Sequence, residues 1–368
     1  MTCPFLGIFL NIPWWRIVRF VSSVRSVHSE YMSSIVTPTL EQLLDTAVVV
    51  SVPLNVRFRG VTHREALLFR GPEGWGEFCP FLEYEPLEAA RWLACAIESA
   101  WQPYPPAVRE RIPVNATVPA VGPDRVPEVL ARSRGEVREV KIKVAEPGQS
   151  LEEDLARIAA VRRAAPGAVV KMDANGGWGH EAALDALRAF AEFSPAYVEQ
   201  PVPTIAGLAR LREAVEREGL GVPIAADESV RKESDPLRVA AEGAADLIVV
   251  KAAPLGGPHH ALSIIRESGL PAVVSSALET SVGMSAGLAL AAALPALDHG
   301  CGLGTASLLA GDLVAEPLIP EDGFLSAGRV DPDPGRLEEW AVGGSRRDAW
   351  LERLRACHAE LDGTPTNA

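Results

Sequence analysis

The feature that most constrains the fold is a run of short apolar segments that alternate with helical ones from about residue 111 onward. The apolar segments have the composition of buried parallel strands, and amphipathic stretches such as 151–165, 181–193 and 208–218 lie between them. Eight strands with their helices within about 200 residues is typical of a closed parallel barrel. The strands that we expect are 113–118, 137–144, 168–174, 196–200, 222–227, 246–251, 271–276 and 299–304.

An open, doubly wound sheet is the alternative to a barrel. Such a sheet would be expected to carry a Gly-rich phosphate loop after its first strand. The sequence has no such loop there, so the barrel is favoured.

The segments before residue 111 predict a different arrangement. Residues 46–79 predict a three-stranded meander, because apolar runs alternate there with turn residues. Residues 85–101 carry apolar side chains at helical spacing. Strands followed by a helix are typical of a small α+β domain. Residues 323–325 and a predicted helix near 349–360 would return to this domain from the far end of the chain.

These patterns divide the chain into four segments. We expect an α/β protein whose (β/α)7β TIM-like barrel occupies residues 111–310, with an α+β capping domain formed by residues 32–110 and the C-terminal segment 311–368. Residues 1–31 are expected to lie outside this fold, with Met32 as the true first residue. Alternatively, this apolar and aromatic extension is an interfacial membrane-binding segment or a structured part of the fold.

The composition argues against several classes of protein. The net charge of -13 disfavours a nucleic acid as the main partner, because phosphate binding requires basic surfaces. Five scattered cysteines form no CxxC pair, which is typical of reduced thiols in the cytoplasm. The longest uncharged run near the start, residues 2–15, is too short to span a bilayer, so we expect no stable membrane insertion. The sequence leaves the oligomeric state open, a monomer included.

Two lysines alternate with aliphatic residues in the segment Val-Lys-Ile-Lys-Val at 140–144. Side chains alternate between the two faces of a strand, so Lys141 and Lys143 point to the same face. Burial of two charges on one face is costly. An edge strand with a solvated lysine face would avoid this cost, but the neighbouring predicted strands favour a functional site.

Charged residues also end the next four predicted strands. The carboxyl ends of the strands in a parallel barrel build its active site. Three carboxylates share such a site only if a cation holds them, and oxygen ligands suit Mg²⁺. The second and sixth strands face each other across the ring, so a substrate on the metal would have a lysine on each side. The residues are Lys141 and Lys143 on the second strand, then Asp173, Glu199, Asp227 and Lys251 on the third to sixth.

This set suits the removal of a proton from the carbon next to a carboxylate. Such a proton is very weakly acidic, and its removal leaves a dianionic enediolate whose charge a divalent cation can stabilise. A lysine is a base only when neutral, which at pH 7 costs roughly 4.6 kcal/mol from a pKa of about 10.4. Burial, Mg²⁺ and a second ammonium group lower that pKa. We therefore expect Lys143 to be the base, Lys141 to lower its pKa, and a small-molecule carboxylate to be the substrate.

Five motifs together resemble the muconate-lactonizing-enzyme-like subgroup of the enolase superfamily. The resemblance implies that Asp173, Glu199 and Asp227 bind Mg²⁺, which Mn²⁺ could replace. It also implies that Lys143 and Lys251 act on opposite faces of the substrate. Asn175 and Glu228 would lie behind the metal ligands or contact the substrate carboxylate. The motifs are Lys-x-Lys at 141–143, Asp-Ala-Asn at 173–175, Glu-Gln-Pro at 199–201, Asp-Glu-Ser at 227–229, and Lys251.

Two further segments, 74–84 and 275–283, resemble the dehydratases of this subgroup that form an aromatic ring in menaquinone biosynthesis. The resemblance implies that Lys143 removes the proton and returns it to the departing hydroxyl group. Ser275 and Ser276 would bind the tail of the substrate, or else satisfy the backbone of their own loop.

Two other functions stay open at this point. A racemase or epimerase of the same subgroup, acting on N-succinylamino acids or dipeptides, would use both Lys143 and Lys251 for proton transfer. The strand-end residues serve that reaction equally well. A non-catalytic binding protein on this fold would be expected to lose a ligand or a lysine, and all of them are present.

Overall fold

The computed structural model describes residues 38–58, 61–231 and 235–361. The chain divides into two units after Thr39, and every described helix and strand belongs to the second unit. The expectation for residues 1–31 therefore lies outside the described residues. Within the described part, no helix has both the length and the apolar character needed to cross a membrane.

Three antiparallel strands and two helices form the N-terminal part of the cap. The helix α2 (Leu40–Asp45) leads into β1 (Val48–Phe58), which pairs with β2 (Val61–Gly71), and β2 pairs with β3 (Gly74–Phe78). The helix α3 (Pro86–Trp101) packs on this sheet through the face that carries its apolar side chains. The predicted meander and the helix that follows it are therefore confirmed.

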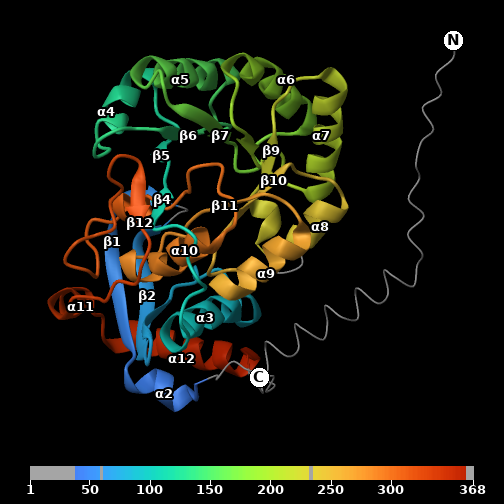
Figure 1. Ribbon diagram of the computed structural model, residues 1–368. Coiled ribbons are helices and arrows are strands. Elements are labelled where there is room, and N and C mark those ends of the chain that lie inside the picture. Colours follow the sequence, from blue (N-terminus) through green and yellow to red (C-terminus); the bar gives the residue numbers. More distant parts are fainter. Residues whose placement is uncertain (1–37, 59–60, 232–234, 362–368) are drawn as a thin grey trace, which may run out of the picture. The chain divides into compact units, whose positions relative to one another are not determined.

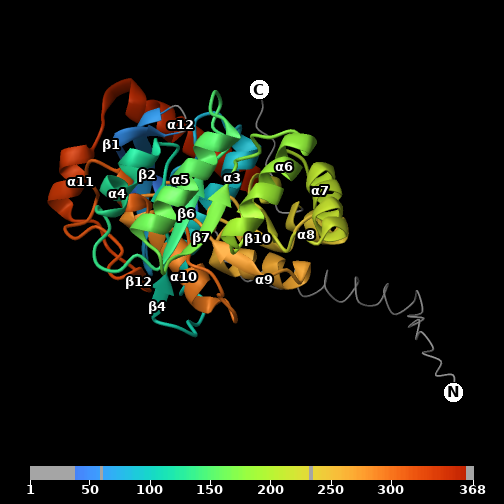
Figure 2. The ribbon, with the colours of Figure 1, turned by 90° about the horizontal axis from the view of Figure 1, so that it is seen from above.

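The C-terminal segment completes the cap. The last helix, α12 (Gly344–Leu361), lies beside α3 (Figures 1 and 2). Its Trp350 meets Phe78 of β3 edge to face, with the ring centroids 5.8 Å apart. Just before α12, Ala341 forms a bridge to Val50 of β1. Both ends of the described chain thus contribute to one α+β cap.

A seven-stranded parallel sheet forms the barrel. Its spatial order runs from β5 to β11 without a reversal, whereas a doubly wound sheet reverses at a switch point. Bridges from Val114 to Cys301 and from Ser275 to Gly302 join the two edges of the sheet. The predicted strand at 299–304 is reduced to these bridges, which close the (β/α)7β barrel. The strands are β5 (Ala116–Val118), β6 (Glu139–Lys143), β7 (Val169–Asp173), β8 (Val198–Glu199), β9 (Ile224–Ala226), β10 (Leu247–Val250) and β11 (Ala272–Val274).

Helices follow these strands around the outside of the sheet (Figure 1). They are α4 (Val126–Leu130), α5 (Leu151–Ala164), α6 (His180–Phe190), α7 (Ile205–Glu218), α8 (Asp235–Ala241), α9 (Pro258–Ser268) and α10 (Ser281–Ala293). A two-stranded sheet of β4 (Arg111–Pro113) and β12 (Phe324–Ser326) and the helix α11 (Pro334–Trp340) lie outside this series.

The barrel strands divide their residues between two apolar clusters. Val140 and Ile142 of β6 belong to the large core. A separate small cluster contains Tyr197, just before β8, and Ala225, Leu247, Val249 and Val273 of β9 to β11. All of these except Leu247 lie two residues before a predicted site residue, and Leu247 lies four residues before Lys251. Since side chains alternate along a strand, the site residues share the inner face of the barrel with this cluster.

Candidate active site

The register of the strands brings the predicted lysines and carboxylates to one edge of the sheet. Lys143 of β6 lies opposite Asp173 of β7, and Asp173 lies opposite Glu199 of β8. Asp227 and Lys251 directly follow β9 and β10. These residues therefore meet at the carboxyl ends of five neighbouring strands, the edge at which barrel enzymes build their sites.

The two lysines of β6 share one carboxylate oxygen. Lys141 Nζ lies 3.2 Å from Asp173 Oδ2 and 3.2 Å from Glu199 Oε1. Lys143 Nζ lies 2.5 Å from the same Asp173 oxygen and donates to Asn175 Oδ1 at 2.8 Å. Lys141 is buried, whereas Lys143 is only partly so. We call the three neighbouring carboxylates of Asp173, Glu199 and Asp227 the carboxylate row. The alternation along β6 thus places two ammonium groups side by side at one end of this row.

The other end of the row holds Lys251, which forms an ion pair with Asp227. Glu228 follows Asp227 and receives hydrogen bonds from Asn175 Nδ2 at 3.3 Å and from Arg231 at 2.9 Å. Its second carboxylate oxygen is buried and has no hydrogen-bond partner among the described residues. Asn175 and Glu228 thus connect the two ends of the row.

The carboxylates of the row repel one another. Burial and the charge of Asp173, followed by that of Asp227, raise the pKa of Glu199 to about 8 even though Lys141 opposes the shift. Burial would raise the pKa of Asp173 too, but Lys143 and Lys141 hold it well below its ordinary value. Burial alone would lower the pKa of Lys141, but Glu199 and Asp173 hold it well above its ordinary value. The neighbouring carboxylates therefore favour the charged form of Lys141.

The donor set of the row suits a hard divalent cation. In the described part of the chain, no group of three or more His, Cys, Asp or Glu side chains is already arranged as a metal site, and the carboxylates face lysines instead. Glu199 nevertheless has a strongly raised pKa, and one Glu228 oxygen lacks a partner. Both features indicate negative charge that the lysines leave uncompensated. Oxygen ligands of this kind prefer Mg²⁺, so the residues fit such an ion.

Gln200, the middle residue of the Glu-Gln-Pro motif, has a role that the motif alone does not indicate. Its Oε1 accepts the N–H groups of Asp227 at 3.0 Å and Ser229 at 3.1 Å. Its Nε2 donates to Ser229 Oγ at 2.8 Å and to the carbonyl of Val202 at 2.8 Å. Gln200 therefore fixes the turn after β9 that presents Asp227. Its place within the Glu-Gln-Pro motif, next to Glu199, is the signal that the sequence offers.

The hydroxyl groups of Ser275 and Ser276 are engaged within the protein. Ser275 Oγ donates to the carbonyl of Gly302 at 3.4 Å. Ser276 Oγ lies 2.6 Å from Thr305 Oγ1 and accepts the Leu278 N–H at 3.3 Å. This geometry favours the interpretation that the loop satisfies its own backbone, and contact of these serines with a substrate stays a prediction.

The cap reaches the same loop through two buried side chains, Arg64 and Glu77. The buried guanidinium group of Arg64 donates to the carbonyls of Leu278 at 2.9 Å and Ala277 at 3.2 Å. Glu77 accepts the N–H of Thr280 at 3.0 Å. The segments 74–84 and 275–283 therefore contact each other, although they are far apart in the chain.

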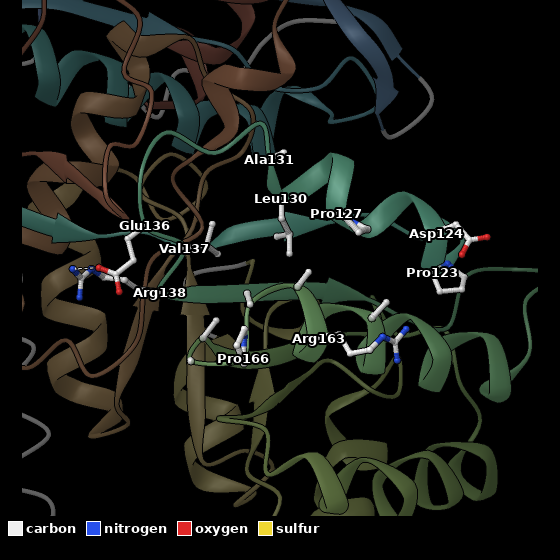
Figure 3. Close-up of a pocket in the computed structure, with 15 residues that line it drawn as sticks. Pro123, Asp124, Pro127, Leu130, Ala131, Glu136, Val137, Arg138, Arg163 and Pro166 are labelled. Carbon is white, nitrogen blue, oxygen red and sulfur yellow. Dashed lines mark ion pairs between the residues drawn. The ribbon is translucent and has the colours of Figure 1, made fainter.

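A hollow of about 1040 Å³ on the outside of the barrel is separate from this site. Leu130 of α4 and Pro166 after α5 lie on facing walls, and the ion pair of Arg138 with Glu136 lies at one edge (Figure 3). The hollow reaches Ala168 at the amino end of β7, about 16 Å from the carboxyl end of a five-residue strand. No predicted site residue lines it.

Two family models match the chain. The family described as Enolase N-terminal domain-like matches residues 49–100, and the family described as Enolase C-terminal domain-like matches residues 125–335. Solved structures of muconate lactonizing enzymes have the same fold. The enzyme from Pseudomonas fluorescens in complex with muconolactone superposes with a TM-score of 0.68 at 23% identity, covering 81% of this chain and 98% of that one. The enzyme from Pseudomonas putida has a TM-score of 0.66 at 22% identity, covering 80% and 98%.

Curated relatives are more similar in sequence. A protein of Mycolicibacterium smegmatis named o-succinylbenzoate synthase is 53% identical over 323 residues, which cover 88% of this chain and 98% of the relative. A protein of the same name from Mycobacterium leprae is 53% identical, covering 88% and 95%. One from Mycobacterium tuberculosis is 52% identical, covering 89% and 98%.

Proposed function

The chain belongs to the enolase superfamily, and from this premise we propose that it is an o-succinylbenzoate synthase, a carbon–oxygen lyase. The reaction is the syn dehydration of 2-succinyl-6-hydroxy-2,4-cyclohexadiene-1-carboxylate to o-succinylbenzoate in menaquinone biosynthesis. The sequence identity of 52–53% to curated synthases over nearly their whole length supports this assignment.

The observation that carries the proposal is the arrangement of lysines around the carboxylate row. Lys143 holds one end of the row through Asp173, and Lys251 holds the other end through Asp227. A carboxylate substrate bound at the row would therefore have an amine on each side. Such an amine next to the acidic carbon is the group that the reaction requires.

The proposed metal ligands are Asp173, Glu199 and Asp227, with Mg²⁺ as the ion and Mn²⁺ as a substitute. The ion, when bound, would stabilise the negative charge that develops on the substrate carboxylate as the proton leaves. The unsatisfied oxygen of Glu228 and the raised pKa of Glu199 support this choice, because a cation would compensate both.

Lys143 carries out the proton transfers in this mechanism. Its neutral Nζ takes the proton from the ring carbon that bears the carboxylate. The adjacent carboxylate takes up the electron pair of that C–H bond as negative charge. The pair then forms the new ring double bond as the C–O bond to the hydroxyl group breaks. Lys143 then gives its proton to the departing hydroxyl group, which leaves as water. Because one group removes and returns the proton, both events occur on one face of the ring, and aromatisation drives the step.

The remaining residues of the site orient the substrate and the base. Lys141, charged and held by Glu199 and Asp173, contributes a fixed positive charge beside Lys143. Lys251 stays protonated and faces the opposite side of the ring. Asn175, which accepts a hydrogen bond from Lys143, holds the base in line with Asp173. Glu228, Ser275 and Ser276 are the proposed contacts of the carboxylate and the succinyl tail.

The domain bounds and the cellular location are proposed as the sequence indicates them. We propose that the cap spans residues 32–110 and 311–368, and that the barrel spans residues 111–310. The four cysteines of the described part are free thiols, which supports a cytoplasmic location.

The direct test follows the cyclohexadiene absorbance of the substrate as it is converted. We expect turnover that requires Mg²⁺ and that stops when the metal is chelated. Lys143→Ala should lower kcat by about 10³-fold, within the factor of about 10² to 10⁴ that general-base catalysis supplies. No turnover by the wild-type protein, or equal turnover after Lys143→Ala, would refute the proposal.

A further inference from the structure

A buried ion pair on α5 lies behind the strand that carries Lys143. Arg157 and Asp154 are one turn apart, their side chains are 1% and 2% exposed, and Arg157 Nη1 lies 2.6 Å from Asp154 Oδ1. The capping box of Ser150 and Glu153 fixes the start of this helix and so the place of the pair. A buried ion pair often stabilises a fold no better than apolar residues would. The role of the Arg157–Asp154 pair is therefore better inferred from the groups that it contacts than from its contribution to stability.

The pair holds the backbone on both sides of the residue that follows Lys143. Arg157 Nη1 donates to the carbonyl of Lys143 at 2.9 Å. Asp154 Oδ2 accepts the N–H of Ala145 at 3.0 Å. One side chain of the pair thus binds the carbonyl and the other the N–H of the chain segment 143–145.

That segment has a conformation that local preferences do not favour. Ala145 has a φ of 62°, in the left-handed region that residues with a β-carbon rarely adopt. Its neighbour Gly177, in the loop after β7, packs so closely that a β-carbon there would lie 2.8 Å from the Ala145 carbonyl oxygen. The strained turn is therefore held by tertiary contacts, of which the bond to Asp154 is one.

The guanidinium group also ties this turn to the loop after β5. Arg157 Nε donates to the carbonyl of Val121 at 2.6 Å. Its Nη2 donates to Gln149, whose own amide donates to the carbonyl of Ala120 at 3.0 Å. Arg157 therefore anchors the end of β6 to the neighbouring strand's loop as well as to its own helix.

We propose that Arg157 and Asp154 are positioning residues that set the location of Lys143 Nζ during proton transfer. The inference rests on the proposed function of Lys143 as the base. The location of Lys143 Nζ depends on its contacts with Asp173 and Asn175 and on the backbone from which the side chain extends. The Arg157–Asp154 pair fixes that backbone without touching the substrate.

Arg162 on the same helix offers a matched control. It too donates to backbone carbonyls, those of Ala168 at 2.8 Å and Phe193. Ala168 lies just before β7, at the end of the strand away from Asp173. Arg157→Lys and Arg162→Lys therefore both remove guanidinium contacts to backbone carbonyls, at opposite ends of the barrel.

The experiment compares kcat, KM and the primary deuterium isotope effect on the transferred ring proton in the wild type, Lys143→Ala and both arginine variants. For Arg157→Lys we expect kcat to fall by about 10- to 100-fold, since a displacement of about 1 Å can cost 10²-fold. KM should stay within about threefold, and the isotope effect should rise, because the proton transfer becomes slower relative to the other steps. Arg162→Lys should keep kcat within about twofold at a similar thermal midpoint.

Unchanged kcat and isotope effect in a folded Arg157→Lys variant would overturn the inference, and so would equal losses in both arginine variants. If Arg157→Lys does not fold, the isosteric Asp154→Asn decides by the same criteria. An inactive wild type, or an active Lys143→Ala, would instead refute the proposed function, and the inference with it. If the wild type is active and Lys143→Ala is inactive, the proposed function stands. The result for Arg157→Lys then tests the positioning role alone.

Discussion

At the scale of single residues, Lys143 and Lys251 have similar surroundings, because each pairs with a carboxylate at one end of the same row. A synthase needs only Lys143 for proton transfer, whereas a racemase needs both lysines. We predict that Lys251→Arg, which keeps the charge, lowers kcat for dehydration by about tenfold. Lys143→Arg should lower it by about 10³-fold or more, because the base is lost. Steady-state loss of the diene absorbance measures both.

A racemase would behave differently in the same variants. The two substitutions would then be equally damaging, and the wild-type protein would change the optical rotation of an N-succinylamino acid at a rate comparable to dehydration. Neither result is expected for a synthase.

Individual residues of the site differ in how far the sequence predicts them. The lysines and carboxylates are predictable because they lie at or near the ends of five neighbouring strands and the period of two fixes which side chains share a face. Gln200 and Arg64 are not, because their partners belong to a neighbouring strand's turn and to the other domain. A local pattern cannot indicate which distant backbone groups a side chain will reach.

At the scale of the elements, the packing of α3 on the cap sheet depends on a glycine. A β-carbon at Gly76 of β3 would lie 2.1 Å from the carbonyl oxygen of Ala96 in α3. We predict that Gly76→Ala lowers the free energy of unfolding by about 1–3 kcal/mol or more, because helix and sheet must move apart. Urea unfolding measures the change. Gly167→Ala is the control, since a β-carbon there meets no atom within 4 Å, and a similar loss in both variants would contradict the explanation.

The contact between β3 and α10 depends on a buried carboxylate. Glu77 accepts the N–H groups of Thr280 at 3.0 Å and Gly283 at 2.9 Å, and so caps the start of α10. We predict that Glu77→Gln lowers the free energy of unfolding by about 2–3 kcal/mol, because the amide loses the charge and turns a donor toward these N–H groups. Urea unfolding again measures the change.

The control for Glu77→Gln is Glu128→Gln. Glu128 pairs with Arg125 and Arg132 on the surface, where solvent screens the ion pairs. The urea midpoint of this variant should match that of the wild type. Equal destabilisation by the two substitutions would mean that the carboxylate of Glu77 has no special role at α10.

The elements themselves are predictable in type but not in length. The strand expected at 196–200 spans only Val198–Glu199, and the strand expected at 299–304 consists of two bridges. An apolar run indicates that a segment is buried and extended. How many of its residues pair is decided by the neighbouring strands, which lie far away in the sequence. The closure of the barrel is therefore the least local property of this fold.

At the scale of the whole molecule, the charges of the site make stability depend on pH. The pKa of Glu199 is about 8, above the value of 4.5 expected in the unfolded chain. The folded protein thus binds this proton more tightly, and the stability it contributes is complete below pH 4.5 and is lost as pH rises through about 8. Burial raises the pKa values of Glu228 and Glu279 as well, so they act in the same direction. The thermal midpoint of the metal-free protein should therefore fall between pH 5 and pH 8.

A divalent cation at the carboxylate row would reverse that loss, because it favours the ionised form of Glu199. We predict that Mg²⁺ raises the thermal midpoint more at pH 8 than at pH 6, with a difference in free energy of at most about 3 kcal/mol over two pH units. Glu199→Gln should reduce this difference to the part that Glu228 contributes, since residue 199 no longer ionises. Glu279→Gln removes a buried carboxyl group outside the row and should keep it. An equal Mg²⁺ effect at both pH values, or a difference that Glu199→Gln leaves undiminished, would place the cation elsewhere on the protein.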